Sequence, residues 1–592
     1  MKQYKLINNL MGWMVFAVAA VVYCMTIESS ASFWDCPEFI TTGYKLEVGH
    51  PPGAPFFMLT ANLFSQFASD PSQVAYMVNV MSALLSAGCI LFLFWSITHL
   101  TRRLICGNST TIKTGQMITI IGAGLVGALA YTFSDTFWYS AVEGEVYAYS
   151  SFFTAVVFWF ILKWEEEADS VRSDRWLILI AYMMGLSVGV HLLNLLCIPA
   201  IVLIYYFKKR PNAGWKGSLV ALIVSAVLIA AILYGIVPGI VKVGGWFELL
   251  FVNGLSMPFN TGLIIYIVVL VGSLVWSIWE THAGASKVRT NIAFLSVVAL
   301  TGLPFYGHGA KCVVVGLVVL GALAAYLFSL DKVKEQWRMS ARVMSTALVS
   351  ILMIVVGYSS YAVIVVRSAA NTPMDQNSPE DIFTLGSYLN REQYGDTPLF
   401  YGGTYASKIA RKVEGQYLVP IVNDGAKVYM PKEKAKADEK DQYFVVRTKK
   451  EYVMEPSMLF PRMHSADHAN WSNGAGGTIN LYDNWVGGIK GREATIGVAG
   501  QKQKVKVPTQ LDNLKFFITY QVNFMYWRYF MWNFVGRQND IQGHGELEHG
   551  NWSMVTGLPA STLSIGSSWA TRHCCPQSCA TTRDVTCSMA CP

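Results

Sequence analysis

Long apolar stretches recur through residues 10–366 of this 592-residue chain, and they constrain its fold more than any other feature. The first, from Leu10 to Ile27, carries no charge, and as a helix rising about 1.5 Å per residue it would reach roughly 27 Å, close to the thickness of a bilayer core of about 30 Å. Ten more follow, at 74–98, 116–132, 147–162, 176–190, 193–207, 218–236, 259–279, 291–305, 312–330 and 343–366. The pattern predicts a polytopic α-helical membrane protein with about 11 to 12 transmembrane helices.

The basic side chains are distributed unevenly between the loops that connect these stretches. With the N-terminus in the cytoplasm, the inner loops hold most of the Lys and Arg side chains, and the short outer loops hold only Lys45, Lys242 and Lys311. Membrane proteins show this positive-inside bias, so the net charge of +7 indicates membrane orientation and no nucleic-acid partner. We therefore expect an integral membrane protein with a cytoplasmic N-terminus. The first outer loop, residues 28–73, then lies on the extracytoplasmic side.

Composition divides the chain into four parts. Residues 1–366 form the predicted transmembrane domain, and residues 367–515 alternate β-like runs with Gly-rich turns, which predicts a small extracytoplasmic α+β domain. Residues 516–552 begin with an aromatic-rich segment that predicts an interfacial or transmembrane helix followed by a connector. Residues 553–592 are rich in Cys, Ser and Thr and show no helical or strand period. We expect this tail to be aberrant or disordered.

The first outer loop combines acidic residues with a proline-rich turn. Asp35 and Glu38 are three residues apart, and Pro37 is well placed to open a helix, so both carboxylates can lie on one face at its N-terminal end. The simplest interpretation is that Asp35 caps this helix. Alternatively, Asp35 is a general base for a hydroxyl proton, with its geometry held by the rigid His-Pro-Pro turn at His50.

Further polar groups are expected on the same side of the membrane. Glu143 and Glu145 follow the third apolar stretch, where one of them can meet the Asp35 loop; on a helix, two residues so spaced would point in different directions. A solvated connector is the alternative for this pair. His191 and Asn194 lie at the junction of two short stretches, where polar side chains line a cavity or satisfy irregular backbone.

Four motifs together resemble one protein family. They are FWDCPEF at 33–39, GHPPG at 49–53, REQYGD at 391–396 and YWRY at 526–529. In these motifs the chain resembles the bacterial DUF2723 family, which is related to the transmembrane protein 260 type of protein O-mannosyltransferase in the GT-C superfamily of membrane glycosyltransferases. The resemblance runs from the N-terminus to about residue 552. It implies a GT-C-like fold in a bacterial inner membrane, with the active face and the soluble domain in the periplasm.

The same resemblance implies transfer of a sugar such as mannose from a polyprenyl-phosphate donor to Ser or Thr hydroxyls of secreted or membrane proteins, with inversion. Asp35 would be the catalytic base, and Glu38 a neighbour that positions substrate or raises the pKa of the base. The leaving phosphate needs cationic or hydrogen-bonding groups, so no cofactor is required and a role for a divalent metal stays open. The candidate substrate and phosphate groups are His50, Lys45, Glu143, Glu145, His191, Asn194, Arg528 and Arg537.

Three alternatives stay open at this point. A transporter or flippase for lipid-linked or small polar substrates also has many spans and intramembrane polar residues. Against it, no inverted repeat is visible and the polar groups concentrate on one face. A non-catalytic assembly factor, whose outer domain binds a secreted partner, is the second alternative. The third alternative concerns Arg528 alone. Instead of binding the donor phosphate, its side chain can extend toward the headgroups of membrane lipids, which are an expected partner.

Overall fold

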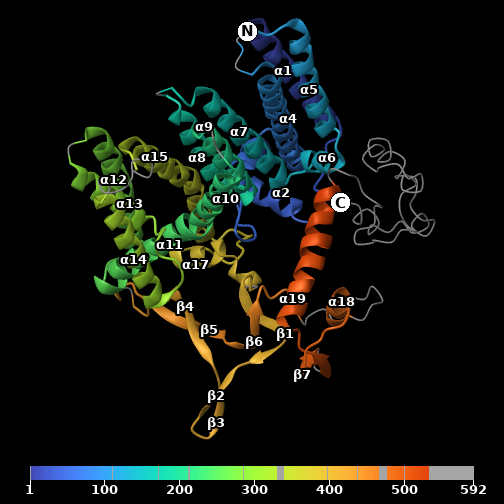
Figure 1. Cartoon of the computed structure of the whole chain (residues 1–592). Helices are drawn as coiled ribbons and strands as arrows, with labels where there is room; N and C mark the ends of the chain where they lie inside the picture. Colours follow the sequence, from blue (N-terminus) through green and yellow to red (C-terminus); the bar gives the residue numbers. More distant parts are fainter. Residues whose placement is uncertain are drawn as a thin grey trace. The chain divides into compact units, whose positions relative to one another are not determined.

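The computed structural model describes residues 2–532, apart from 108, 110, 171, 211–213, 285, 330–338, 396–397, 437, 466–476 and 499–500. Helices dominate up to about residue 394, and strands and helices alternate after it (Figure 1). The chain divides into two compact units, one comprising Met1–Gly395 with Ala426–Lys449 and the other Asp396–Gly425 with Lys450–Pro592. The predicted helical part followed by a small strand-containing part is therefore present. The predicted domain boundary after residue 366 stays a prediction.

The first unit is built from helices of very different lengths. The longer ones are α1 (Lys2–Met25), α4 (Val74–Cys106), α5 (Thr114–Thr132), α7 (Val146–Glu167), α8 (Asp174–Val188), α9 (Ile198–Lys209), α10 (Trp215–Ala230), α11 (Val237–Leu249), α12 (Thr261–Ala283), α13 (Lys287–Leu300), α14 (Gly309–Phe328) and α15 (Ala341–Tyr358). The shorter ones are α2 (Cys36–Lys45), α3 (Pro55–Ser65), α6 (Asp135–Ala141), α16 (Ala362–Ala369) and α17 (Ile382–Leu389), and η2 (Leu192–Cys197) is a 3₁₀ turn. Two π-helical segments, η3 (Ala231–Ile236) and η4 (Leu250–Gly254), extend α10 and α11 into one long helical segment.

Nine helical segments within the described residues are long and apolar enough to cross a membrane. They coincide with nine of the eleven predicted stretches. The stretches 176–190 and 291–305 instead form α8 and α13, whose 15 and 14 residues fall short of the roughly 20 that a crossing helix needs. α8 ends where Gly189 begins the break before His191, and α13 ends just before Gly302, which has a φ of +73°.

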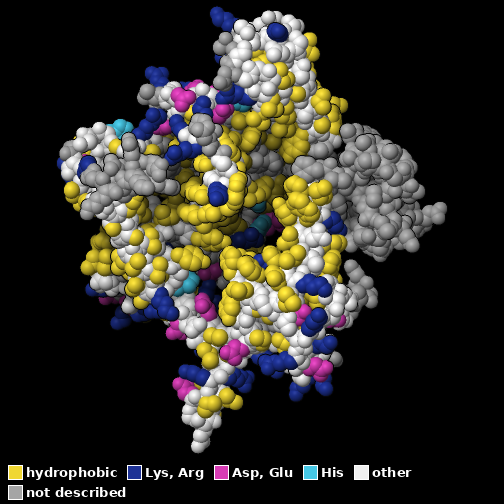
Figure 2. Space-filling view, viewed as in Figure 1, with side chains coloured by type: hydrophobic (Ala, Val, Ile, Leu, Met, Phe, Trp, Pro, Cys, Tyr) yellow, Lys and Arg dark blue, Asp and Glu magenta, His cyan; other side chains and the backbone are white. Residues whose placement is uncertain are grey.

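Exposed apolar side chains suit these helices to a lipid environment. Figure 2 shows apolar side chains over much of the helical unit on the face in view. Several on α12 and α14 are more than half exposed: Val268, Val275, Val314, Leu317 and Val318. Such contiguous apolar surface is unfavourable in water and favourable against lipid chains.

Small residues allow the N-terminal helices to pack closely. α4 packs against α1, α5 and α7, and its buried face carries Ser82, Ala83, Ser86 and Ala87. A Cβ atom added at Gly88 would lie 2.8 Å from the ring of Phe152 on α7. Side chains of this size permit the close helix approach that membrane bundles depend on.

A β-hairpin belongs to the helical unit. It consists of β4 (Val422–Pro431) and β5 (Tyr443–Tyr452), and most of its residues fall in the first unit. The buried carboxylate of Glu248 accepts hydrogen bonds from the backbone N–H of Asn260 (2.6 Å) and from the Tyr443 hydroxyl (3.3 Å). Asn253 also bonds both backbone groups of Tyr443, at 2.8 and 2.9 Å. These contacts anchor the hairpin to the end of α11.

The second unit combines short antiparallel strand pairs with helices. Its strands are β1 (Tyr401–Ile409) paired with β6 (Met454–Leu459), β2 (Arg411–Glu414) paired with β3 (Tyr417–Pro420), and β7 (Glu493–Val498) paired with β8 (Gln501–Lys506). Its helices are α18 (Gly477–Val486), α19 (Gln510–Phe516), the π-helical η9 (Phe517–Trp527) and α20 (Arg528–Trp532). The aromatic segment therefore is helical to residue 532, while its predicted location at the membrane stays a prediction. The predicted connector and the tail 553–592 lie outside the described residues.

Candidate functional site

Asp35 lies at the start of α2, and its side chain does not cap the helix. Pro37 lies in the first turn of α2, as the sequence predicted, and the Asp35 backbone carbonyl accepts from Phe39 N–H at 2.9 Å. The exposed Asp35 carboxylate makes no capping hydrogen bond, and within the described part of the chain it has no hydrogen-bond or ion-pair partner. The interpretation of Asp35 as a side-chain cap is therefore not realised. A carboxylate of this kind is free to accept a proton from a substrate hydroxyl.

Glu38 holds the His-Pro-Pro turn. It accepts hydrogen bonds from the His50 backbone N–H (2.6 Å) and from the ring Nδ1 (2.8 Å). The hydrogen bond to Glu38 outweighs burial and raises the pKa of His50. For Glu38, burial favours the neutral acid, but the hydrogen bonds from the ring and backbone of His50 outweigh it and lower the pKa. Glu38 and His50 thus form an ion pair that shapes the loop.

Gly49 provides the space for this ion pair. A Cβ atom at this position would lie 2.7 Å from Glu38 Oε1, a distance that requires the carboxylate to move. We expect Gly49→Ala to separate Glu38 from His50 and to destabilise the protein by about 1–3 kcal/mol, because a partly buried charged group loses its hydrogen bonds. The thermal unfolding midpoint in detergent measures the effect. The matched control is Gly122→Ala in α5, where no atom lies within 4 Å; equal midpoints for the two variants would contradict the assignment.

Helix α17 fixes the turn from a second direction. The Tyr388 hydroxyl donates to the carbonyl of Gly49 at 2.6 Å. Gly53, with a φ of +74°, lies so close that a Cβ atom would stand 2.6 Å from this hydroxyl. Val48 also forms a parallel bridge to residues 374–376, with hydrogen bonds of 2.9 and 3.1 Å. The turn is therefore held between α2 and the segment that follows the last candidate span.

Arg391 is the functional candidate that the sequence reasoning missed. Its backbone N–H bonds to the carbonyl of Tyr388 at 3.0 Å, and its guanidinium lies over the ring of Tyr394, 4.8 Å from the centroid. Its positive charge acts on both His50 and His191, so the three side chains share one site. The motif REQYGD drew attention to this segment, but only the docking of α17 on the turn shows where Arg391 lies.

His191 occupies the predicted break between α8 and α9. Burial lowers its pKa, and the charge of Arg391 lowers it further, so the ring is neutral near pH 7. Leu193 N–H donates to His191 Nδ1 at 3.1 Å, which leaves the proton of the neutral ring on Nε2. His191 therefore presents an N–H donor. Asn194 is fully buried, and its side-chain amide has no hydrogen-bond partner among the described residues.

Glu143 and Glu145 both belong to the surroundings of Asp35. They lie in the bend between α6 and α7 and not on a helix, so the expectation that they would point apart is wrong in its premise. Glu143 accepts a hydrogen bond from the Ser32 hydroxyl at 2.7 Å, which ties the bend to the loop before α2. Burial, followed by the charges of Glu143 and Asp35, raises the pKa of Glu145 to about 7. The structure thus gathers several carboxylates around this loop.

Of the remaining predicted cations, Lys45 lies away from Asp35 within the first unit. Lys45 is exposed at the last residue of α2, roughly 15 Å along the helix from Asp35. Arg528 belongs to the second unit, where its Nε donates to the Phe524 carbonyl at 3.0 Å and its guanidinium stacks on the Phe524 ring. Arg537 lies outside the described residues. In the part of the chain that the structure describes, no three His, Cys, Asp or Glu side chains form a group able to hold a metal ion.

Comparisons with known proteins match two segments of the chain. Residues 35–214 match the family model described as the protein O-mannosyl-transferase TMEM260 N-terminal domain. This segment begins at Asp35 and also contains Glu38, His50, Glu143, Glu145 and His191, whereas Tyr388 and Arg391 lie outside it. Residues 395–518 match a family of unknown function, DUF8416.

Two curated relatives are both named protein O-mannosyl-transferase TMEM260. The protein from Mus musculus is 28% identical over 199 residues, which cover 33% of this chain and 26% of the relative. The protein from Dictyostelium discoideum is 24% identical over 201 residues, which cover 33% of this chain and 22% of the relative. The similarity therefore spans about a quarter of the length of these relatives.

Proposed function

We propose that the protein is a membrane glycosyltransferase that moves a sugar, mannose by analogy with the names of its relatives, from a polyprenyl-phosphate donor to Ser or Thr hydroxyls of secreted or membrane proteins. The observation that carries the proposal is the Asp35 carboxylate, which makes no capping hydrogen bond to α2. Asp35 is also the first residue of the segment that is similar to an O-mannosyl-transferase domain. The charge of Asp35 acts on His50 and Glu145, and the charge of Arg391 acts on His50 and His191. This combination suits a base beside an anionic leaving group.

In the proposed reaction Asp35 accepts the proton of the acceptor hydroxyl. The hydroxyl oxygen then attacks the anomeric carbon from the face opposite the phosphate, and the bond between that carbon and the phosphate oxygen breaks. Polyprenyl phosphate leaves with the bonding electrons, and the configuration at the sugar carbon inverts. The guanidinium of Arg391 and the Nε2–H of His191 supply donors for the charge that develops on the phosphate. No cofactor takes part in this scheme.

The remaining parts of the proposal concern fold, location and partners. We assign residues 1–366 to a GT-C-like transmembrane domain of the DUF2723 type, with the N-terminus in the cytoplasm of a bacterium. The site and the strand-containing region would then face the periplasm across the inner membrane. The partners are the lipid-linked donor, a secreted or membrane protein as acceptor, and the surrounding lipids.

The raised pKa of Glu145 predicts that binding of the donor depends on pH. With a pKa of about 7, its carboxyl is mainly neutral at pH 6 and mainly ionised at pH 8. The repulsion of two charges roughly 10 Å apart at a dielectric constant of about 40 is worth about fourfold in affinity between the neutral and the ionised carboxyl. Because pH 6 to 8 covers only part of this titration, the KM for the anionic donor should rise about threefold over the interval. Glu145→Gln should remove this increase. An unchanged pH profile in Glu145→Gln, measured by initial rates, would show that another group causes the effect.

Sugar transfer by the purified full chain tests the proposed function directly. The protein in lipid nanodiscs receives radiolabelled polyprenyl-phosphate mannose and a Ser/Thr-containing peptide. Label in the peptide, attached with the configuration opposite to that of the donor, is the expected result. In proteoliposomes, movement of the donor across the bilayer without label in the peptide would instead favour a flippase, and neither activity would favour an assembly factor.

A further inference from the structure

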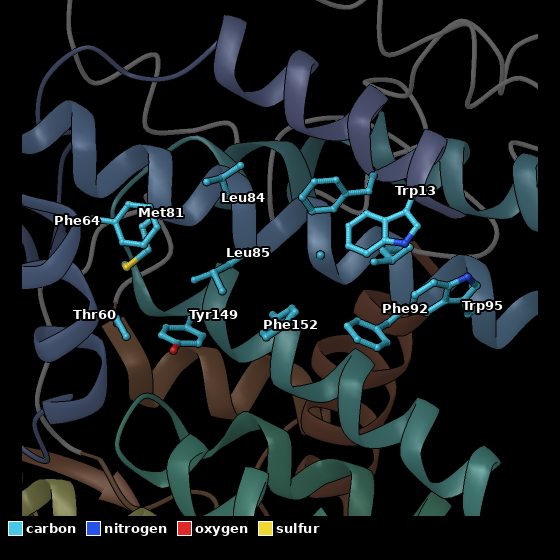
Figure 3. Close-up of a pocket in the computed structure, with 13 residues that line it drawn as sticks. Trp13, Thr60, Phe64, Met81, Leu84, Leu85, Phe92, Trp95, Tyr149 and Phe152 are labelled. Carbon is cyan, nitrogen blue, oxygen red and sulfur yellow. The ribbon is translucent and has the colours of Figure 1, made fainter. Parts of the chain in front are cut away.

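An apolar groove of about 400 Å³ lies between α1, α3, α4 and α7 (Figure 3). Aromatic and aliphatic side chains line most of it, and the hydroxyls come from Thr60 and Tyr149. The volume falls in the range of small-molecule sites. A polar ligand would find few hydrogen-bond partners on these walls, so the groove favours an apolar occupant.

The groove runs lengthwise along α4. Its lining residues on this helix extend from Met81 to Trp95 at helical spacing, a rise of roughly 21 Å at about 1.5 Å per residue. Figure 3 shows Thr60, Phe64 and Met81 at one end and Trp13 and Trp95 at the other. The length is about two thirds of a bilayer core of about 30 Å. α4 is itself a candidate span, so a lipid chain lying along it would fit the groove in direction and in polarity.

One end of the groove is formed by the elements that carry the acidic site. α3 begins at Pro55, shortly after the His50 turn, and contributes Thr60 and Phe64 to the lining. α7 begins at Val146, directly after Glu145, and contributes Tyr149 and Phe152 of its first two turns to the lining.

α4 provides a further link at this end. Asn79, two residues before Met81, donates from Nδ2 to the backbone carbonyls of Glu28 (2.7 Å) and Ser30 (3.0 Å) in the loop that leads to Asp35. All three helices that flank the acidic site thus continue directly into the groove walls. An apolar chain in the groove would have its polar head close to Asp35 and Glu145.

We propose that this groove binds the isoprenoid chain of the lipid-linked donor and so positions the sugar phosphate beside Asp35. The inference rests on the proposed function, which supplies a substrate with a phosphate at one end and a long apolar chain at the other. Continuity between the groove and the acidic site favours this occupant over a bulk phospholipid, whose headgroup the reaction does not use. The groove then selects for the carrier lipid, while the polar site selects for the sugar.

Photolabelling tests the groove without requiring sugar transfer. The full chain in phosphatidylcholine nanodiscs is labelled with a photoreactive polyprenyl phosphate that carries no sugar. Leu84, 36% exposed in the groove wall, is replaced by Trp to fill the space, and Leu84→Trp should reduce labelling about tenfold, the loss of about two buried methylene groups. The matched control is Val126→Trp on α5, which is 72% exposed and outside the groove, and it should label as the wild type does.

Two results would overturn the assignment. One is that Leu84→Trp and Val126→Trp are labelled equally, although both variants unfold at the wild-type midpoint. The other is equal competition by phosphatidylglycerol and by unlabelled polyprenyl phosphate, which would make the groove a site for bulk lipid. Should Leu84→Trp fail to fold, Leu84→Ala serves instead, and it should alter the preference between short and long polyprenyl chains.

The transfer assay separates this inference from the proposed function. With a full-length donor, Leu84→Trp should raise KM about tenfold, and with a chain-truncated, water-soluble donor it should leave KM unchanged. A wild-type protein that transfers no sugar would refute the enzyme, while the photolabelling would still report on the groove. An active protein whose KM rises equally for both donors would refute the groove alone.

Discussion

Asp35→Asn should lower the rate of sugar transfer by about 10²- to 10⁴-fold, the usual contribution of a general base. Asn is nearly the same size as Asp but cannot accept the hydroxyl proton. The fold should tolerate this change, because the exposed Asp35 carboxylate neither caps α2 nor pairs with any described residue. The loss should therefore appear in kcat, measured with labelled donor and peptide at saturating concentrations. The unfolding midpoint should stay at its wild-type value.

Asp70→Asn is the matched control for this prediction. Asp70 lies in the same predicted loop, and its side chain accepts from the Ser72 N–H at 2.8 Å to cap a short 3₁₀ turn. Because it takes no part in the acidic site, its replacement should leave the transfer rate unchanged. Full activity in Asp35→Asn would place the base elsewhere, and Glu145, with its raised pKa, would be the next residue to replace.

Arg391→Ala should reduce kcat/KM for the donor by about 10- to 100-fold, the range expected when charge-assisted hydrogen bonds worth about 1.5–3 kcal/mol are lost. Arg391→Lys should recover part of this loss, since Lys keeps the charge but not the planar fork that matches a phosphate. A second readout is the pKa of His191, followed by NMR. It should rise in Arg391→Ala, because one of the two causes that lower it has been removed.

Arg175→Ala provides a control for the loss of an arginine. Arg175 pairs with Glu167 and is more than half exposed, so its removal should cost at most about 1 kcal/mol and should not affect the donor. If Arg391→Ala left both kcat/KM and the pKa of His191 unchanged, Arg391 would have no part in the site. A lower kcat/KM with an unchanged pKa of His191 would point to a distortion of the turn through Tyr388.

The spans could be predicted because hydrophobicity acts locally. A helix in lipid must be apolar along its whole length, so nine predicted stretches reappear as candidate spans. The short lengths of α8 and α13 could not be predicted, since an apolar composition does not show where a helix ends. The breaks depend on backbone at Gly189 and Gly302, and the close packing of Gly185 in α8 against Gly357 in α15 depends on residues far apart in sequence.

The site shows the same division between local and distant contacts. Asp35, Glu38 and His50 lie within 16 residues of one another, so the pairing of acid and turn was visible in the sequence. The role of Glu38 as the partner of His50 was not, because it depends on the fold-back of the chain at Gly49. The position of Arg391 depends on how α17 packs, and no local pattern encodes that. Lys45 shows the opposite case. It is close to Asp35 in the sequence, but the two residues lie at opposite ends of α2.

The hydrogen bond between Tyr388 and Gly49 has a consequence for biosynthesis. Its two residues are 339 positions apart, and the turn that it braces is needed for the site. At about 5–20 residues per second, the ribosome adds Tyr388 on the order of tens of seconds after Gly49. Until then the first loop lacks its second brace and the Arg391 side chain. A chain that is still being inserted therefore should be inactive, and activity should begin only once the last candidate span has been synthesised.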